Sequence, residues 1–505
     1  MTLSPVFING NDLGFEELNQ VVNLRHPVEL AADARERVGA ARAVVDKLVL
    51  ENRLAYAITT GVGQLSDVRI DAARNRRLQL NLVRSHASGI GEPLTQEETR
   101  AMMLLRANSL AKGYSGVRIE VISMLCEMLN CGVHPVIPSQ GSVGASGDLA
   151  PLAHLALTLI GEGEACVGGE RMDGAESLQR AGLSPLVLEA KEAISLINGT
   201  QAMLAVGTTA LALAETLLQT ADVISAMSLD ALRGTDVAFD ERIHAVRPHS
   251  GQKEVAARLR RLLHGSAIRV SHLQCSRVQD AYSLRCIPQV HGAVQDTLEF
   301  CRRTFIIEMN SAVDNPLVFA REGGEGDVIS GGNFHGEPLA FALDYLAIAM
   351  SALAGISERR TERLVNPALN EGLPPFLTPD AGMNSGFMMP QVAAAALVSE
   401  NKVLAHPASV DSITTSGNKE DYVSMGMASA IKLKKILANV TNVLAIEACA
   451  AAQALDFLSP LRTSEPLQRA HARIRQASPR LEQDRVLAGD FAKVAGLVRT
   501  GALMV

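Results

Sequence analysis

Five long stretches of this 505-residue chain are apolar with helical spacing, and several of them are apolar almost all the way around a helical wheel. They cover residues 200–230, 286–312, 337–358, 388–405 and 424–456. In a water-soluble chain, helices that are apolar on every side belong at the centre of a large bundle. Polar residues such as Thr208, Glu215 and Asp344 interrupt the stretches, and none reaches the ~18 uninterrupted apolar residues of a membrane span. The sequence therefore predicts a mainly α fold built on a large elongated helical bundle.

The composition supports helices and argues against several classes of protein. Aromatic residues make up 3% of the chain and Trp is absent, whereas sandwiches and barrels rely on aromatic and β-branched side chains. Lys and Arg number 47 against 54 Asp and Glu, a net charge of −7, which argues against a nucleic-acid-binding surface. The seven cysteines form no CxxC pair, so their spacing indicates neither a zinc site nor a disulfide framework. We expect free thiols and, with no secretory leader visible, a cytoplasmic protein without a membrane partner.

The first 200 residues differ in character from the rest. Helical periodicity predicts several helices there, at 29–53, 72–88 and 95–130. Thr95 followed by Glu98 forms the pattern of a capping box, and a short hairpin is expected over 163–186. We therefore divide the chain into an N-terminal α-rich domain, 1–200, and a central long-helix bundle with a C-terminal helical cap, 201–505.

A glycine-rich loop at 141–148 reads GSVGASGD and runs into a helix at Asp148 and Pro151. Loops of this kind at helix N-termini can bind phosphate through backbone N–H groups. The loop lacks the Lys of GxxxxGK[ST], and it is not a GxGxxG that follows a strand. A structural turn is the plainer interpretation, and the residues alone leave both open.

Tyrosines are few, and three of the five lie in segments rich in helix breakers: Tyr56, Tyr282 and Tyr422. A phenol near a loop can serve as an acid or base when its pKa is tuned. Tyr282 and Arg285 are three residues apart, so on a helix they would share one face, with a guanidinium able to hold a carboxylate. A packed tyrosine beside a surface arginine explains the same spacing.

Other candidates are weaker when taken singly. Asn198 and the GGNFHG segment at 331–336 are amide-bearing turns, and most such turns have no further role. Glu420 precedes the helix expected from 424, where an acidic residue fits the helix dipole. Ser85 and His86 close the helix over 72–88. None of the twelve histidines forms HExxH, so no metal site is indicated.

Taken together, these segments closely resemble the aromatic amino-acid ammonia-lyase family, which includes histidine, phenylalanine and tyrosine ammonia-lyases. The run GSVGASGDLAPLAHLAL matches its signature. The flanking segments match in the same order: INGT, QDxYSLRCxPQVHG, DNPL, GGNFHGEP, NSGFMMPQ and AHPASVDSITTS. The likeness covers nearly the whole chain. It implies a mostly helical fold, carbon–nitrogen lyase activity and a homotetramer whose subunits share active sites, acting on a small amino acid.

The resemblance also implies a prosthetic group made from the chain itself. Ala145, Ser146 and Gly147 would cyclise and lose water to give methylidene-imidazolone (MIO), with no diffusible cofactor. Ammonia is a poor leaving group and proteins have no electrophilic side chain, so an electrophile must be built from backbone. Ring closure brings the Gly147 nitrogen to the Ala145 carbonyl, which is easiest for a residue without Cβ in a tight bend.

By matching motif positions, the resemblance assigns the remaining roles. Tyr282 would take the β-proton, and Tyr56 would belong to the loop that closes the site. Arg285, helped by Asn315, would bind the substrate carboxylate. The residues expected to contact the prosthetic group or the remainder of the substrate are Asn198, Gln279, Phe334 and Glu420.

The substrate is expected from the pair Ser85-His86, which is typical of the histidine branch of the family. A buried polar ring needs hydrogen-bonding partners, and Glu420 also suits an imidazole. Lys419 and Tyr422 depart from the usual histidine-lyase pattern, as do Ala57, Thr59 and Val62 in the Tyr56 loop. Tyrosine or phenylalanine ammonia-lyase activity and a 2,3-aminomutase therefore remain alternatives to the formation of urocanate from histidine. A catalytically inactive helical relative is a further class.

Overall fold

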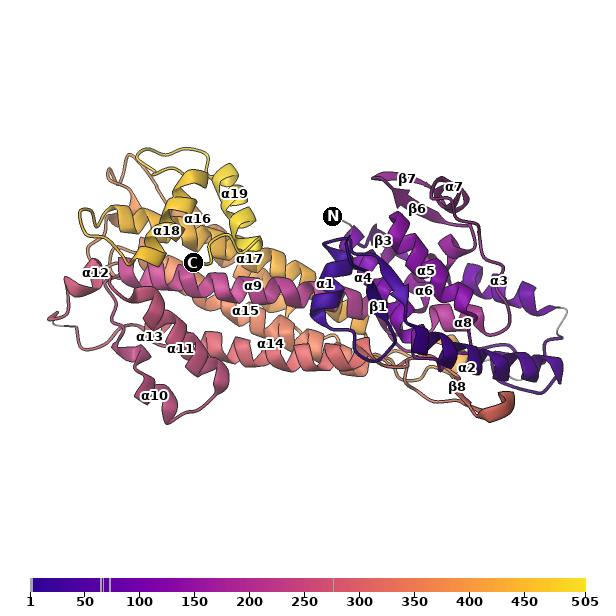
Figure 1. Cartoon of the computed structure of the whole chain (residues 1–505). Coiled ribbons are helices and arrows are strands. Elements are labelled where there is room, and N and C mark those ends of the chain that lie inside the picture. Colours follow the sequence, from indigo (N-terminus) through magenta and orange to yellow (C-terminus); the bar gives the residue numbers. More distant parts are fainter. Residues whose placement is uncertain (1–2, 64–65, 67, 72–73, 276) are drawn as a thin grey trace. The chain divides into compact units, whose positions relative to one another are not determined.

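The computed structural model describes all residues except 1–2, 64–65, 67, 72–73 and 276. The described residues form nineteen α-helices and nine strands of three or four residues, so the predicted mainly α fold is confirmed (Figure 1). The chain divides into two compact units, and each is assembled from three separate segments. The first unit comprises Met1–Thr209, Arg302–Leu343 and Pro407–Ile431. The second comprises Ala210–Cys301, Asp344–His406 and Lys432–Val505.

The first unit contains eight helices of its own. These are α1 (Phe15–Val22), α2 (Ala32–Leu50), α3 (Asn75–His86), α4 (Gln96–Ala111), α5 (Ile119–Cys131), α6 (Leu149–Leu159), α7 (Gly174–Arg180) and α8 (Glu192–Ile197). Helix α4 packs against α5, and α3 packs against both α6 and α8. Nearly every residue of α4 is buried, whereas α2 buries only one face, with Val38, Val45 and Leu48 among its core residues.

Small sheets hold the loops of this unit in place. The strands are β1 (Val6–Ile8), β2 (Val28–Leu30), β3 (Ile90–Pro93), β4 (Val133–Pro135), β5 (Pro138–Gln140), β6 (Glu164–Val167), β7 (Glu170–Asp173), β8 (Leu317–Ala320) and β9 (Gly326–Ile329). Strand β1 pairs with β2 in parallel, whereas β3 with β5, β4 with β6 and β8 with β9 are antiparallel. Strands β6 and β7 form the hairpin expected over 163–186.

The continuous helix expected over 95–130 is wrong, because the chain leaves the helix between α4 and α5. Gly113 has φ +87°, and a Cβ there would lie 2.7 Å from the Cβ of Arg37. Gly116 has φ +68°, and a Cβ there would lie 2.5 Å from a methyl group of Val45. Both positions need glycine to pass close to α2, and this tertiary contact overrides the helical periodicity. The capping box at the start of α4 is confirmed, with Thr95 and Glu98 each bonding the other's backbone N–H.

The second unit is built from long helices and smaller ones packed around them (Figure 1). Its own helices are α10 (Glu241–Ala245), α11 (Ser250–Leu263), α12 (Ala267–Val270), α13 (Tyr282–Arg285), α16 (Met388–Leu404), α18 (Glu465–Ala477) and α19 (Ala488–Arg499). Four further helices contribute residues to both units: α9 (Gln201–Ala231), α14 (Ile287–Met309), α15 (Glu337–Val365) and α17 (Gly426–Asp456). The sequence predicted one boundary near residue 200. The first unit instead comprises Met1–Thr209 together with two later segments.

Three helices, α9, α15 and α17, are long and apolar enough to cross a membrane by length and composition. Their most apolar windows are 72%, 61% and 89% buried within the protein. Most of the apolar surface that would otherwise need lipid is therefore covered by other parts of the chain, as expected for central helices of a bundle.

Candidate active site

Three cavities of the first unit have Ser146 and Glu420 in their walls, with volumes of about 350, 270 and 400 Å³. The residues around them come from six separate parts of the chain. Among those expected from the sequence, the structure places here Tyr56, Ser85, His86, Ala145, Ser146, Gly147, Asn198, Asn315, Phe334 and Glu420. Residues that seemed weak candidates singly thus gather around one tripeptide.

The glycine-rich loop is held in a conformation that only glycine can adopt at two positions. Gly147 has φ +70°, and a Cβ there would lie 2.1 Å from the carbonyl oxygen of Gly199. Gly144 also has φ +70°, and its Cβ would lie 2.2 Å from the hydroxyl of Ser424. The N–H of Asp148 donates to the Gly199 carbonyl at 2.7 Å, which fixes the loop against the start of α9. The loop is therefore a rigid bend with the small residues Ala145 and Ser146 at its tip.

Ser146 is hydrogen-bonded through both its hydroxyl and its carbonyl oxygen. Its hydroxyl donates to Oε1 of Glu420 at 2.6 Å, and its carbonyl oxygen accepts from Nδ2 of Asn198 at 2.7 Å. The second oxygen of Glu420 accepts from the hydroxyl of Thr415 at 2.8 Å. Oδ1 of Asn198 is buried and has no hydrogen-bond partner among the described residues. Glu420 lies before α17 rather than at its first turn, so its carboxylate serves the loop and not the helix dipole.

Asp148 occupies the N-cap position of α6, but its carboxylate does not cap that helix. One oxygen accepts from the Ser142 hydroxyl at 2.8 Å and the other from the backbone N–H of Met203 at 2.8 Å. Complete burial raises the pKa of Asp148 to about 6, although both of these hydrogen bonds lower it. The carboxylate therefore ties the glycine-rich loop to α9 through uncharged donors.

Two buried cations support the residues behind the loop. Arg106 donates to the Asn198 carbonyl at 2.9 Å and to Oε1 of Gln201 at 2.8 Å, and burial lowers its pKa to about 10. Lys191 pairs with Asp314 at 2.7 Å, with both side chains fully buried. Neither of these cations was predicted from the sequence. An arginine inside the apolar run MMLLRANSLA is the signal that would have found Arg106.

Asp314, the partner of Lys191, also forms a hydrogen bond with the backbone of Asn315. Its Oδ1 accepts from the backbone N–H of Asn315 at 2.6 Å, and the Asn315 side chain then accepts from the N–H of Gly331 at 2.9 Å. The lysine–aspartate pair thus sets the position of an amide in the cavity wall. Nothing in the spacing of Lys191 and Asp314 along the chain indicates that they meet.

Ser85 and His86 lie at the C-terminal end of α3, as expected. Nδ1 of His86 is 2.8 Å from the carbonyl of Leu82, which makes it the protonated nitrogen and leaves Nε2 as an acceptor. In the cavity of about 350 Å³, which Ser85 and His86 do not line, the ring of Tyr422 stacks on that of His335 with centroids 6.0 Å apart. Tyr56 accepts from the backbone N–H of Gly63 at 3.1 Å. Taken together, the cavities around Ser146 offer both polar and aromatic side chains.

Three of the expected site residues, Gln279, Tyr282 and Arg285, belong to the second unit, whereas the cavities around Ser146 are walled by residues of the first. Tyr282 and Arg285 form the two ends of α13 and share one face, with the guanidinium 4.5 Å from the centre of the phenol ring. Tyr282 is 70% exposed. Gln279 and Arg285 line a cavity of about 420 Å³ within their own unit.

No group of three or more His, Cys, Asp and Glu side chains that could hold a metal ion occurs in the part of the chain that the structure describes.

Residues 13–476 match the family of aromatic amino acid lyases. The chain belongs to that family. It is 66% identical over 510 residues to histidine ammonia-lyase of Koribacter versatilis, a match that covers 99% of each protein. The crystal structure of histidine ammonia-lyase from Trypanosoma cruzi superposes with a TM-score of 0.91 at 46% identity, covering 99% of this chain and 94% of that one. Tyrosine aminomutase from Streptomyces globisporus has a TM-score of 0.93 at 38% identity, covering 99% and 98%.

Membership of the aromatic amino acid lyase family makes this protein a carbon–nitrogen lyase that eliminates ammonia. The resemblance drawn from the sequence motifs is thereby confirmed, as are the enzyme class and the helical fold. The matched residues include the whole of the glycine-rich loop and every residue placed around Ser146.

Proposed function

We propose that this lyase eliminates ammonia from L-histidine without oxidation and releases trans-urocanate. The proposal rests mainly on the hydrogen bonds to Ser146, from its hydroxyl to Glu420 and from Asn198 to its carbonyl oxygen. Ser85 and His86 line two of the cavities that also contain Ser146. The 66% identity to histidine ammonia-lyase of Koribacter versatilis supports the choice of substrate.

The tripeptide fits the prosthetic group that the family resemblance implies. To form it, the Gly147 nitrogen bonds to the Ala145 carbonyl carbon and two waters leave, one of them carrying the Ser146 hydroxyl. The left-handed backbone of Gly147 leaves no room for a Cβ. Nδ2 of Asn198 donates to the Ser146 carbonyl at 2.7 Å. The buried Oδ1 of Asn198 has no hydrogen-bond donor among the described residues. Once formed, the group would supply the electrophile that makes ammonia a better leaving group.

The residues of the first unit would bind and orient the substrate. Phe334 offers a face to the imidazole ring, and Nε2 of His86 is free to accept a hydrogen bond from it. Glu420, beside the Ser146 oxygen, is placed to hold the ammonium or the imidazole N–H. Asn315, fixed through Asp314, would hydrogen-bond the carboxylate. Tyr56 lines the cavity and would limit the access of water.

Tyr282, Arg285 and Gln279 would complete the site from another copy of the chain. Tyr282 would take the β-proton, Arg285 would bind the carboxylate in two parallel hydrogen bonds, and Gln279 would donate to it. The guanidinium of the half-buried Arg285 lies over the ring of the exposed Tyr282, so the two groups lie together on one face of α13. This assignment requires the homotetramer with shared active sites that the family resemblance implies.

All seven cysteines are free in the structure, which suits a reducing compartment, and we propose that the enzyme works in the cytoplasm.

The substrate is tested by incubating the purified enzyme with L-histidine, L-tyrosine and L-phenylalanine and following the ultraviolet band of each conjugated acrylate. We expect growth of the urocanate band with histidine. No growth with histidine, together with growth for tyrosine, would overturn the substrate. The intact mass provides the second measurement, and it should be lower than the mass of the sequence by two water molecules.

A 2,3-aminomutase, or a lyase acting on tyrosine or phenylalanine, is the second candidate. The likeness to tyrosine aminomutase of Streptomyces globisporus and the exposed Tyr422 and Lys419 at the cavity favour it. A mutase returns ammonia to the β-carbon, so the products would contain a β-amino acid. Chromatography of the same reactions separates the two candidates, because a lyase yields free ammonia and acrylate alone.

A further inference from the structure

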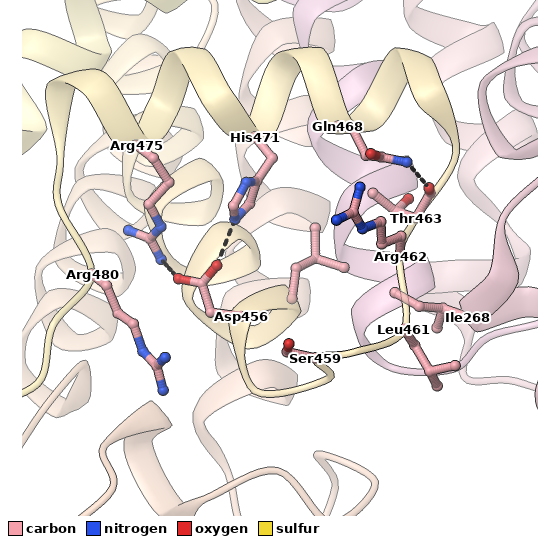
Figure 2. Close-up of a pocket in the computed structure, with 11 residues that line it drawn as sticks. Ile268, Asp456, Ser459, Leu461, Arg462, Thr463, Gln468, His471, Arg475 and Arg480 are labelled. Carbon is pink, nitrogen blue, oxygen red and sulfur yellow. Dashed lines mark hydrogen bonds and ion pairs between the residues drawn. The ribbon is translucent and has the colours of Figure 1, made fainter.

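A cavity of about 550 Å³ lies in the second unit, at the C-terminal end of α17. The end of α17, the loop that follows it and one face of α18 form most of its wall, and Ile268 of α12 closes one side (Figure 2). Leu455, Leu461 and Ile268 provide apolar surface. The remaining lining is polar and rich in arginine, and a volume of this size is ordinary for a site that takes a small molecule.

The carboxylate in this cavity is already neutralised. Asp456 accepts from Nε2 of His471 at 2.8 Å and from Nη2 of Arg475 at 2.8 Å, and Figure 2 shows both contacts. Burial raises the pKa of Asp456, but the hydrogen bond from His471 and the charge of Arg475 outweigh it and lower the pKa overall. Arg475 also donates to the Ser478 carbonyl at 2.9 Å and to Oε1 of Gln453 at 3.1 Å. Asp456 and Arg475 therefore form a fixed and balanced pair.

Two further arginines line the cavity without such partners. The guanidinium groups of Arg462 and Arg480 make no hydrogen bond or ion pair with any residue that the structure describes. In Figure 2, Arg480 lies at the left and Arg462 at the right, with Asp456 and His471 between them. Arg480 is held over the ring of Phe457 at 5.3 Å, and the Arg462 carbonyl accepts from the N–H of Ala267 at 2.9 Å. Both arginines are exposed to solvent, and the lining of the cavity carries more positive than negative charge.

We propose that this cavity binds a small metabolite with two phosphate groups. Arg462 and Arg480 would each take one phosphate, since a guanidinium matches the oxygens of a phosphate with two parallel hydrogen bonds. The body of the ligand would rest on Leu455, Leu461 and Ile268, and the hydroxyl of Ser459 offers a further polar contact. The site makes no use of the tripeptide chemistry, so it stands or falls independently of the proposed function.

The test is isothermal titration calorimetry on the intact enzyme with three probes: inorganic phosphate, fructose 1,6-bisphosphate and citrate. We expect the bisphosphate to bind most tightly, and binding to weaken as salt is added. Arg462→Gln and Arg480→Gln should each lower the affinity for the bisphosphate about tenfold, because each removes one charge-assisted contact. Each variant should leave the affinity for inorganic phosphate within a small factor, since the other arginine remains.

Arg499→Gln is the matched control, because Arg499 is an exposed arginine at the end of α19 that does not line the cavity. It should bind like the wild type, and far-ultraviolet circular dichroism should show that all three variants are folded. The proposal is wrong if the bisphosphate gives no heat of binding at millimolar concentration. It is also wrong if citrate binds more tightly than the bisphosphate, or if Arg499→Gln weakens binding as much as the two cavity variants.

Discussion

Asp148 in the first unit and Asp456 in the second are both largely screened from water, yet their pKa values move in opposite directions. Burial raises the pKa of Asp148 to about 6, because its partners are a serine hydroxyl and a backbone N–H, neither of which carries charge. The pKa of Asp456 falls despite burial, because His471 and Arg475 hold its carboxylate. Asp148 is completely buried and has only uncharged partners, whereas Asp456 is partly exposed and has charged or polar ring partners that offset its burial.

The two regions therefore suit different tasks. Around Ser146, uncharged donors fix a strained loop, and the nearby carboxylates Glu420 and Asp148 have no cation as hydrogen-bond partner among the described residues. Around Asp456, the cations outnumber the single carboxylate, and two arginines are left over. The first arrangement preserves a backbone geometry and the second preserves a charge.

The sharpest test of the first region is Ser146→Ala. Without the hydroxyl that leaves as water, the prosthetic group should not form normally, and activity should fall by on the order of a thousandfold or more. The fold should survive, because Ser146 is not part of the core. Assays of turnover and intact mass should show low activity without the loss of two waters. Turnover close to that of the wild type would contradict the role given to the tripeptide.

Tyr282→Phe tests whether the second unit also contributes to catalysis. We expect turnover to fall by about 10²–10⁴-fold, the usual contribution of a general base, while the mass still shows the loss of two waters. The variant also allows a complementation experiment. Co-expressed with Ser146→Ala, it should form mixed oligomers more active than either parent, since some sites then combine an intact tripeptide with an intact tyrosine. If the mixture is no more active than its parents, the shared site is wrong.

Lys191→Met tests how much the buried ion pair between Lys191 and Asp314 contributes to the free energy of unfolding. Removing one partner of a buried ion pair leaves Asp314 uncompensated, and the free energy of unfolding should fall by about 3–5 kcal/mol. Lys47→Met is the control, because Lys47 pairs with Glu325 on the exposed surface and its loss should matter far less. Urea unfolding of both variants measures the difference. Equal shifts in midpoint would show that the buried pair has no special weight.

The smallest effects are expected for Asp148→Asn and Asp456→Asn, which directly test the opposite pKa shifts of the two carboxyl groups. The folded pKa of Asp148 lies above its ordinary value, so its contribution to stability is present at low pH and is lost as the pH rises through about 6. Asp148→Asn should therefore stabilise the protein at alkaline pH by about 1–2 kcal/mol. Asp456 has a lowered pKa, so its contribution is present near neutrality and is lost in acid.

Asp456→Asn should accordingly destabilise the protein near neutral pH by about 1–3 kcal/mol, since Arg475 and His471 lose a charged partner. The urea midpoint of each variant is measured at acid and at alkaline pH. At alkaline pH it should rise for Asp148→Asn and fall for Asp456→Asn. Changes of the same sign would remove the distinction between the two regions.

Much of this architecture was predictable from local patterns. The apolar periodicity located the long helices, and Thr95 with Glu98 marked the start of α4 because a capping box is a purely local arrangement. The end of α4 was not predictable, because the approach of Gly113 to Arg37 depends on how α2 packs. The resemblance to the family predicted which residues lie around Ser146. Their spacing in the sequence alone did not decide whether any of them has a functional role.

Buried pairing was the main feature beyond reach of the sequence. Lys191 and Asp314 are 123 residues apart, and only the folded backbone brings them together. Arg462 and Arg480 are exposed arginines 18 positions apart in the sequence, and only the structure places both in the wall of one cavity. Charges that interact through tertiary contacts leave no periodic signature.

The four helices α9, α14, α15 and α17 each supply residues to both units. As a result, no single cut in the gene releases either half as an intact piece, and truncation to a minimal catalytic fragment would sever helices in mid-length. Recombination with a relative faces the same constraint, because one crossover would join mismatched halves of several helices. Useful chimaeras of this enzyme should exchange loops such as 141–148 or 459–463 and leave the helices whole.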